Sequence, residues 1–232
     1  NKTQVHPLSE NDHIHNRLTH SLEVASVGRS LGLRAGELIH NQLNQNINPH
    51  DVSYIVQTAC LAHDIGNPPF GHAGEDSIKK WFKDTTNDKY LSSLSKNQRY
   101  DFEHFDGNAQ SFRIVCDLEN NIHQGGMCLS FATLGCLVKY PRSSQDTEKF
   151  SFFQSEKYLF DIIFKELGLM QNGEIIRHPL SYLMEIADDI CYSLLDIKDA
   201  IELEIISLKD VQDIFKLFKL EKYDKIINAN MN

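Results

Sequence analysis

The chain has 232 residues, 41% of them hydrophobic and 24% charged, a composition ordinary for a soluble globular protein. Its formal net charge of −9 argues against a broadly basic surface for nucleic acid. No apolar run approaches the roughly 18 residues of a membrane span, and no secretory leader opens the chain. We therefore expect a single cytoplasmic domain over residues 1–232, with no membrane partner.

The first stretch, residues 6–16, is polar and rich in turn-forming residues. Its three histidines, His6, His13 and His15, are interpreted as exposed side chains rather than as a ligand cluster. From Asn16, a candidate N-cap, leucines recur at helical spacing. Arg17 and His20 are three residues apart in this helix and so share a face.

Three glycines, Gly28, Gly32 and Gly36, follow at four-residue spacing in the same predicted helix. They mark one side on which another helix can approach closely. Asn48-Pro49 begins the next helix, because proline is tolerated in a first turn.

Residues 63–75, HDIGNPPFGHAGE, are the most informative stretch of the chain. His63 lies on the buried stripe of the helix before it, and Gly66 with the two prolines ends that helix. The adjacent His63 and Asp64 offer one neutral nitrogen and one anionic oxygen, which suits Mg²⁺, Mn²⁺, Fe²⁺ or Zn²⁺. The alternative is a core histidine that is hydrogen-bonded to its neighbour.

The remaining pattern predicts helices over residues 73–83, 105–118 and 152–167, and an apolar helix before Pro141. Residues 84–101 read as a polar, mobile connection, and the short EIIR at 174–177 as extended. Pro179 opens a long helix, and Ser207 with Asp210 resembles a capping box for the last one. Because alternating strands are too few to build a sheet, we expect an all-α fold.

The long helix from Pro179 carries Asp188, Tyr192 and Asp196 at four-residue spacing, which puts them on one face. A polar stripe that ought to be buried requires partners. A metal ion shared with His63 would pair Asp188, and a bound sugar would pair the other two side chains. The alternative is that Asp188 and Asp189 face solvent.

The five cysteines form no CxxC pair and fall in apolar segments that read as helix: Cys60, Cys116, Cys128, Cys136 and Cys191. We expect reduced thiols in the core of a cytoplasmic protein. Cys60 and His63 form a CxxH pair, but no second CxxC or HxxxH accompanies it, which disfavours a structural zinc site.

The order His20, then His63-Asp64, then Asp188 is the H…HD…D signature of HD-domain metal phosphohydrolases. Five longer segments resemble bacterial dGTP triphosphohydrolases and related dNTPases, in the family's order: NRLTHSLEV, LAHDIGNPPFGHAGE, FDGNAQSFRI, LGCLVKYPR and YLMEIADDICYSLLDIKDA. The resemblance implies an HD-domain helical bundle around a single metal site. Because the family usually runs further, we expect residues 1–232 to lack its C-terminal part.

By this resemblance, a deoxynucleoside triphosphate (dGTP or several dNTPs) is hydrolysed to the deoxynucleoside and inorganic triphosphate. The residues that match the family's ligands to a divalent ion (Mn, Mg, Fe or Zn) are His20, His63, Asp64 and Asp188. His72 and Glu75 match a catalytic pair in which the histidine transfers a proton and the carboxylate orients it; His104 is a further catalytic candidate. Substrate contacts are implied for the sugar (Tyr192, Asp196), the phosphates (Arg17, Lys139) and, more loosely, the nucleotide site (Gln4, Asn108).

Two other functions stay open at this point. One is a different HD-domain nucleotide phosphohydrolase, such as a monophosphate phosphatase. The other is a non-catalytic relative that binds nucleotide or single-stranded DNA, although the retained His72 and Glu75 favour an enzyme. The resemblance also implies a homo-oligomer and raises single-stranded DNA as a partner.

Overall fold

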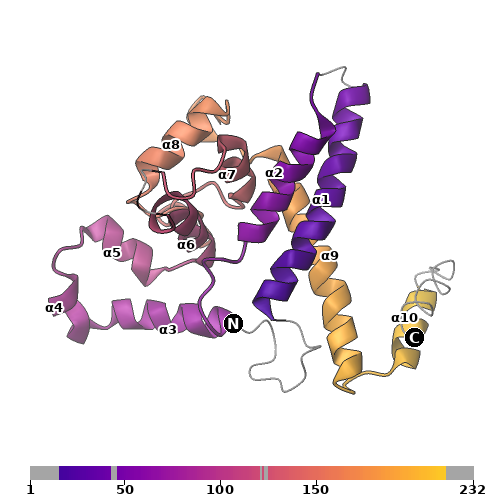
Figure 1. The fold of residues 1–232 in the computed structure, drawn as a ribbon. Helices are drawn as coiled ribbons and strands as arrows, with labels where there is room; N and C mark the ends of the chain where they lie inside the picture. The colour runs from indigo at the N-terminus through magenta and orange to yellow at the C-terminus, as the bar shows by residue number, and fades with distance from the viewer. Residues whose placement is uncertain (1–15, 43–45, 121, 123–124, 218–232) are drawn as a thin grey trace.

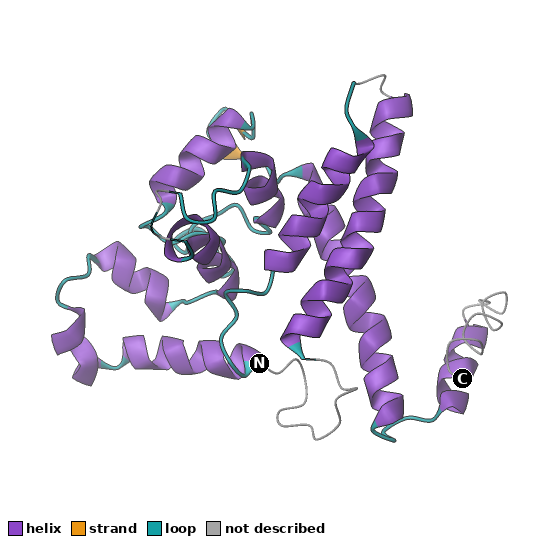
Figure 2. Ribbon diagram, viewed as in Figure 1, coloured by secondary structure: helices purple, strands orange, loops and turns teal. Residues whose placement is uncertain are grey.

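The computed structural model describes residues 16–42, 46–120, 122 and 125–217, and helices dominate this part of the chain (Figure 2). The expectation of an all-α fold is confirmed. Within the described ranges the strands are β1 (Met170–Gln171) and β2 (Glu174–Ile175), a minimal antiparallel hairpin in which Met170 faces Ile175. None of the described helices is long and apolar enough to cross a membrane.

Three long helices form the frame that positions the site: α1 (Arg17–Gln42), α2 (Pro49–Ala62) and α9 (Pro179–Glu202). α1 packs most extensively on α2, and α9 contacts both (Figure 1). Asn16 caps α1 as expected, because its side-chain oxygen accepts from the amides of Leu18 and Thr19. Asn48 caps α2 in the same way.

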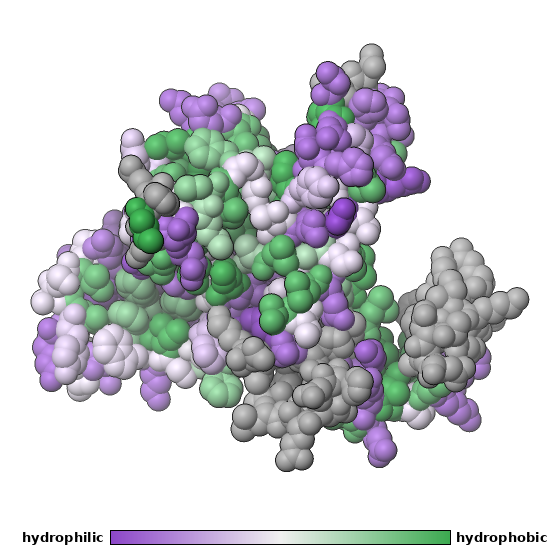
Figure 3. Space-filling model, in the orientation of Figure 1, coloured by the Kyte–Doolittle hydropathy of each residue, from purple (hydrophilic) through white to green (hydrophobic). Residues whose placement is uncertain are grey.

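The glycine stripe of α1 is where α2 comes closest, as the four-residue spacing predicts. A Cβ atom at Gly32 would lie 2.9 Å from the Cα of Ser53, and one at Gly36 would lie 2.6 Å from the Cα of Pro49. Backbone therefore meets backbone along this seam. Figure 3 shows that hydrophilic side chains gather at the end of the molecule where α1 ends and α2 begins.

A helical arm follows the turn over residues 63–70. It consists of α3 (Gly71–Lys83), the 3₁₀ turn η1 (Thr85–Asn87), α4 (Asp88–Leu91) and α5 (Lys96–Glu103). The prediction of a mobile connection over residues 84–101 is therefore wrong. Local capping explains why this polar stretch is helical: Asp84 accepts from the amide of Thr86, and Ser95 with Gln98 forms a capping box.

The rest of the core is built from α6 (Gly107–Arg113), the π-helical turn η2 (Ile114–Leu118), α7 (Phe131–Leu137) and α8 (Lys157–Glu166). α8 begins later than the predicted residue 152, because Phe152 and Phe153 are buried in the loop before it. The last helix, α10 (Leu208–Leu217), has the predicted capping box of Ser207 and Asp210.

Two burial predictions need correction. Cys128 is exposed, while the other four cysteines are buried; burial raises the pKa of the Cys60 thiol to about 12. The polar stripe of α9 is not wholly buried either, since Tyr192 is 57% exposed. In Figure 1 the C-terminal part of α9 extends beyond the start of α1. In the described part of the chain, α1 therefore does not cover this part of α9.

Candidate metal centre and substrate pocket

His63 is held in one orientation by the end of α2. It is the C-cap of that helix, and its Nδ1 lies 2.6 Å from the carbonyl oxygen of Cys60. Because a carbonyl oxygen can only accept a hydrogen bond, Nδ1 carries the proton and Nε2 keeps its lone pair. The helix end thus presents Nε2 as a ligand atom.

The turn after His63 is fixed against α6. The hydroxyl of Ser111 donates to the carbonyl of His63 and accepts from the amide of Gly66. A Cβ atom at Gly66 would collide with the backbone of Ser111, which explains why glycine stands there. This backbone contact holds the His-Asp pair on a rigid part of the fold.

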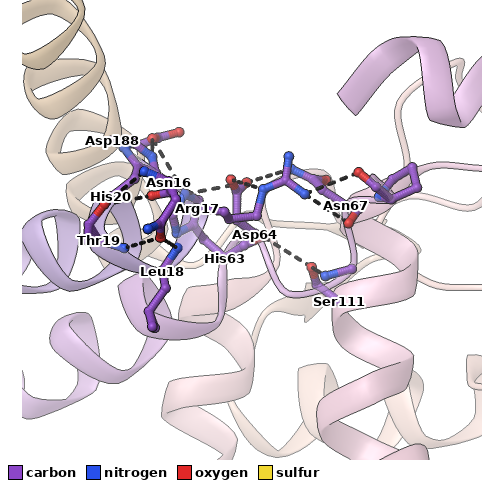
Figure 4. A network of polar contacts seen from close by, with 12 residues as sticks. Asn16, Arg17, Leu18, Thr19, His20, His63, Asp64, Asn67, Ser111 and Asp188 are labelled. Carbon is purple, nitrogen blue, oxygen red and sulfur yellow. Dashed lines mark hydrogen bonds and ion pairs between the residues drawn. The ribbon is translucent and has the colours of Figure 1, made fainter. Parts of the chain in front are cut away.

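His20, His63 and Asp64 converge at one point between the three long helices (Figure 4). One ligand atom from each lies within 4.8 Å of the others. Asp188 reaches the same point from α9: its Oδ1 lies 3.1 Å from His20 Nε2 and 3.5 Å from His63 Nε2. The neighbouring Asp189 is exposed.

This donor set fits a divalent cation. Nε2 of His63 is buried and has no hydrogen-bond partner among the described residues, and it faces carboxylate oxygens of Asp64 and Asp188 at 3.5 Å. Two imidazoles and two carboxylates suit a borderline or hard ion. Burial raises the pKa of Asp188, but His20 and His63 outweigh it and hold that pKa well below its ordinary value. Burial lowers the pKa of His63, yet Asp188 and Asp64 bring it above normal.

Arg17 and Asn67 support Asp64 from outside the donor set (Figure 4). Asn67 Nδ2 donates to Oδ1 of Asp64 at 2.6 Å, and Nε of Arg17 lies 3.5 Å from its Oδ2. Arg17 also donates to the carbonyls of Asn67 and Pro68. Arg17 was predicted to contact phosphate. In the structure its side chain instead contacts the turn that follows His63 and supports it.

The donor set opens into a pocket of about 700 Å³. Its walls come from the start of α1, the 63–75 stretch, α6, the segment after α7, and α9. The sequence-predicted residues among its lining are Arg17, His20, His63, Asp64, His72, Glu75, Asn108, Lys139, Asp188 and Tyr192. The sequence reasoning missed other lining residues, among them Asn67, Phe70, Tyr140, Lys149 and Glu185.

Of these, Lys149 and Phe70 have the least sequence signal. Lys149 ends a polar loop without periodicity, and its Nζ lies 3.5 Å from Oδ2 of the buried Asp106. Phe70 is 68% exposed and has a positive φ of 66° at the N-cap of α3. A positive φ is uncommon for a bulky residue, so the sequence pattern does not predict it.

His72 and Glu75, the catalytic pair matched by resemblance, differ in how deeply they are buried. His72 is exposed in the first turn of α3, whereas Glu75 is buried and its Oε1 accepts from the amide of Gly107 at 2.9 Å. No hydrogen bond joins the two side chains in the described residues. Glu75 thus anchors the start of α6.

Two predicted residues do not line this pocket, and a third is outside the described part of the chain. His104 stacks on Tyr100 with ring centroids 4.0 Å apart and does not line the pocket. Asp196 is half-buried on α9, and it too is absent from the lining among the residues described. Gln4 lies outside the described residues, as do His6, His13 and His15.

Comparison with known proteins agrees with this geometry. The sequence matches the HD domain over residues 17–122, which contain three of the four convergent donors. The chain therefore belongs to the HD-domain family, as the resemblance predicted.

Several similar proteins are named after a particular enzyme activity. A deoxyguanosinetriphosphate triphosphohydrolase-like protein of Pseudomonas aeruginosa is 51% identical over 220 residues, covering 91% of this chain and 50% of the relative. One of Synechocystis is 43% identical, covering 91% and 52%. The deoxyguanosinetriphosphate triphosphohydrolase of Serratia proteamaculans is 34% identical, covering 90% and 48%. The chain thus spans about half the length of these relatives.

Proposed function

We propose that this protein hydrolyses deoxynucleoside triphosphates, dGTP or several dNTPs, to the deoxynucleoside and inorganic triphosphate with the help of a divalent metal ion. The observation that carries the proposal is the convergence of His20, His63, Asp64 and Asp188 inside a pocket that also contains lysines. Names of relatives that mention dGTP support the choice of substrate.

The four convergent side chains would hold the ion. When bound, a divalent ion polarises a phosphoryl oxygen and lowers the pKa of a bound water. The chain's own residues then bind and orient the substrate. His72 is the candidate for proton transfer, because it is exposed in the pocket wall and an imidazole can both accept and donate a proton.

The triphosphate would lie toward the cationic wall. Lys139 and Lys149 both line the pocket, and each is paired with one acid, Glu185 and Asp106 respectively. An ammonium group has three N–H donors, so each lysine keeps donors for phosphate oxygens. The same wall would attract any substrate with a polyphosphate.

The sugar would lie along α9. Tyr192 is one turn beyond Asp188, about 6 Å along a helix that rises about 1.5 Å per residue. Its ring is partly exposed in the pocket, where it can pack on deoxyribose and clash with a ribose 2′-hydroxyl. Asp196, a further turn along, is proposed to accept from the 3′-hydroxyl.

The decisive experiment is an assay of the purified protein with each dNTP and each rNTP, with the phosphate products identified. Release of inorganic triphosphate from dNTPs supports the proposal. Orthophosphate from deoxynucleoside monophosphates alone would establish a monophosphate phosphatase instead, and nucleotide binding without turnover would establish a non-catalytic relative. A homo-oligomer and single-stranded DNA binding stay predictions, which sedimentation and gel-shift measurements check.

If α9 recognises the sugar, Tyr192→Ala is expected to reduce the preference for dGTP over GTP, measured as a ratio of kcat/KM. The reason is that removing the ring removes the clash with the 2′-hydroxyl. Tyr158→Ala, which replaces a 79% exposed tyrosine on α8, is the matched control and should keep the ratio. An unchanged ratio in Tyr192→Ala would contradict the role of the ring.

A further inference from the structure

A second polar network lies against the pocket and has no part in the donor set. Glu185 is at its centre: its Oε1 lies 2.9 Å from Nζ of Lys139, and its Oε2 lies 2.7 Å from a terminal nitrogen of Arg177. The carboxylate is thus held from two sides. Glu185 and Lys139 line the pocket, whereas Arg177 stands behind them.

Arg177 is itself fixed to the start of α9. Its Nε donates to the hydroxyl of Ser181 and its NH2 group to the carbonyl of the same residue. Its guanidinium also lies 4.1 Å from the ring centroid of Tyr182. With its side chain only 17% exposed, Arg177 gives Glu185 a stationary partner.

The backbone at Lys139 is tied to the same helix face. The hydroxyl of the fully buried Ser181 donates to the carbonyl of Val138, the residue before Lys139. Ser181, Glu185 and Asp188 recur at spacings of four and three, so they share one face of α9. One helix face therefore sets both the position of a metal donor and the position of a pocket lysine.

We propose that Glu185 is a positioning residue that aims the ammonium group of Lys139 at the substrate's triphosphate, with Arg177 as its fixed support. This inference rests on the proposed function for the identity of the ligand. It assigns a role to Glu185 and Arg177, two residues that the sequence motifs do not single out.

The charges explain how an acid can assist the binding of an anion. Glu185 faces two cations, so the three side chains together carry one positive charge. Without the carboxylate, Lys139 would lose its hydrogen-bond partner and would be free to leave the pocket wall. Without Arg177, the full negative charge of Glu185 would act on Lys139 and on an incoming triphosphate.

A simpler interpretation is that Glu185 competes with phosphate for Lys139. The two interpretations predict opposite signs for Glu185→Gln. A positioning residue strengthens triphosphate binding, so its loss weakens binding. A competing acid weakens binding, so its loss strengthens it.

The experiment is calorimetric binding of inorganic triphosphate to the full chain in a chelator, which removes metal ions and makes the result independent of hydrolysis. We expect Glu185→Gln to bind triphosphate roughly tenfold more weakly than the unchanged protein, the scale on which a hydrogen bond to a charged group acts. Arg177→Gln should weaken binding several-fold, and Glu185→Asp should lie between Glu185→Gln and the unchanged protein. Glu202→Gln, which alters an acid near Lys198 on the same helix, should change nothing.

Lys139→Met separates positioning from general support of the fold. In that background Glu185→Gln should cause no further loss, because the group that it positions is gone. An equal loss in both backgrounds, tighter binding by Glu185→Gln, or no triphosphate binding by the unchanged protein would each overturn the proposal. Should Glu185→Gln not fold, Arg177→Gln and Glu185→Asp carry the same test.

These outcomes are distinct from failure of the proposed function. A protein that shows the expected binding pattern but cleaves no dNTP would retain the lysine site and lose the activity assignment. The converse result, dNTP cleavage with unaltered binding in the variants, would leave the activity and remove the role of Glu185. In an active protein, Glu185→Gln should raise KM for dGTP more than it lowers kcat.

Discussion

At the scale of single residues, the site is organised by what each side chain can donate or accept. Cys60 offers His63 a carbonyl, which selects the tautomer with a free Nε2. Asn67 and Arg17 orient the carboxylate of Asp64 in a comparable way. The donors are therefore fixed in place by their neighbours.

His72 and His104 test which histidine takes part in the proposed reaction. His72→Ala is expected to lower kcat by about 10²–10⁴-fold, the usual worth of general acid–base help, while metal content stays unchanged. His104→Ala is the matched control, since that ring stacks on Tyr100 away from the pocket lining. Steady-state kinetics and elemental analysis measure both effects. An unchanged kcat in His72→Ala would refute its role.

The convergence of the candidate donors could be predicted from sequence, because adjacency marks two of them and the match to the family's signature adds His20 and Asp188. His63 and Asp64 are neighbours, and Asp188 stands on a helix whose face can be counted. Lys149 and Glu185 could not be predicted, because their partners lie 43 and 46 residues away in the chain, at Asp106 and Lys139. Such pairs exist only once the helices have packed.

At the scale of helices, the seam between α1 and α2 depends on glycine. Gly32→Ala would put a Cβ atom 2.9 Å from the Cα of Ser53 and 3.0 Å from the carbonyl oxygen of Val52. We expect a net loss of about 1–2 kcal/mol in the free energy of unfolding, because overpacking outweighs the gain in helix propensity. Chemical denaturation measures this loss.

Ser30→Ala on the same helix is the control for that substitution. Ser30 is exposed and donates to the carbonyl of Ser26, so its replacement should alter stability by less than about 0.5 kcal/mol. Equal stability of Gly32→Ala and Ser30→Ala would contradict a tight seam.

The start of α9 is predicted to be sensitive to acid. Nδ1 of His178 accepts from the amide of Leu180 and so caps the helix in its neutral form. Burial lowers the pKa of His178 below its ordinary 6.5. The fold therefore favours the neutral ring: its contribution is complete above the unfolded-state pKa and is lost as the pH falls below about 6.5.

His178→Asn keeps a capping acceptor that does not titrate near neutrality. Unfolding measured between pH 7.5 and pH 5 should show a smaller loss of stability in His178→Asn than in the unchanged protein, by roughly 1 kcal/mol, the worth of a cap. His50→Asn, at an exposed histidine in the first turn of α2, should leave the pH dependence in place. Parallel pH profiles for all three proteins would rule out the cap as the acid-sensitive group.

Helix positions were largely predictable because caps and periodicity are local. Asn16, Asn48, Pro179 and the Ser207–Asp210 box all mark true helix boundaries. The arm over residues 84–101 was missed, since its polar composition hid the capping interactions that order it. Composition alone does not distinguish a polar helix from a loop.

At the scale of the whole molecule, the candidate metal centre joins segments that are far apart in the chain. His20 comes from α1, His63 and Asp64 from the end of α2, and Asp188 from α9. Four donors from three helices cannot meet in an unfolded chain, so an ion that they hold binds the folded state preferentially. The candidate site and the stability of the fold are therefore linked.

This linkage makes a prediction that does not depend on activity. A metal ion at about 100 times its Kd should stabilise the fold by about 2.7 kcal/mol. For a chain of this size that corresponds to a rise in Tm of about 5–10 °C. Thermal unfolding in a chelator, and then with Mn²⁺, Mg²⁺, Fe²⁺ or Zn²⁺ in excess, measures the shift and ranks the ions.

Two variants decide whether the shift comes from the convergent donors. Asp64→Ala removes one donor and should abolish the rise in Tm, leaving Nε2 of His63 without the ion. Asp189→Ala removes the adjacent, exposed acid on α9 and should keep the full rise, because this residue is not one of the convergent donors. A rise of equal size in Asp64→Ala would place the bound ion elsewhere on the surface. The absence of a rise in Tm with all four ions would contradict a metal centre formed by these donors. The Nε2 resonance of His63, followed as metal is added, reports directly whether this donor binds the ion.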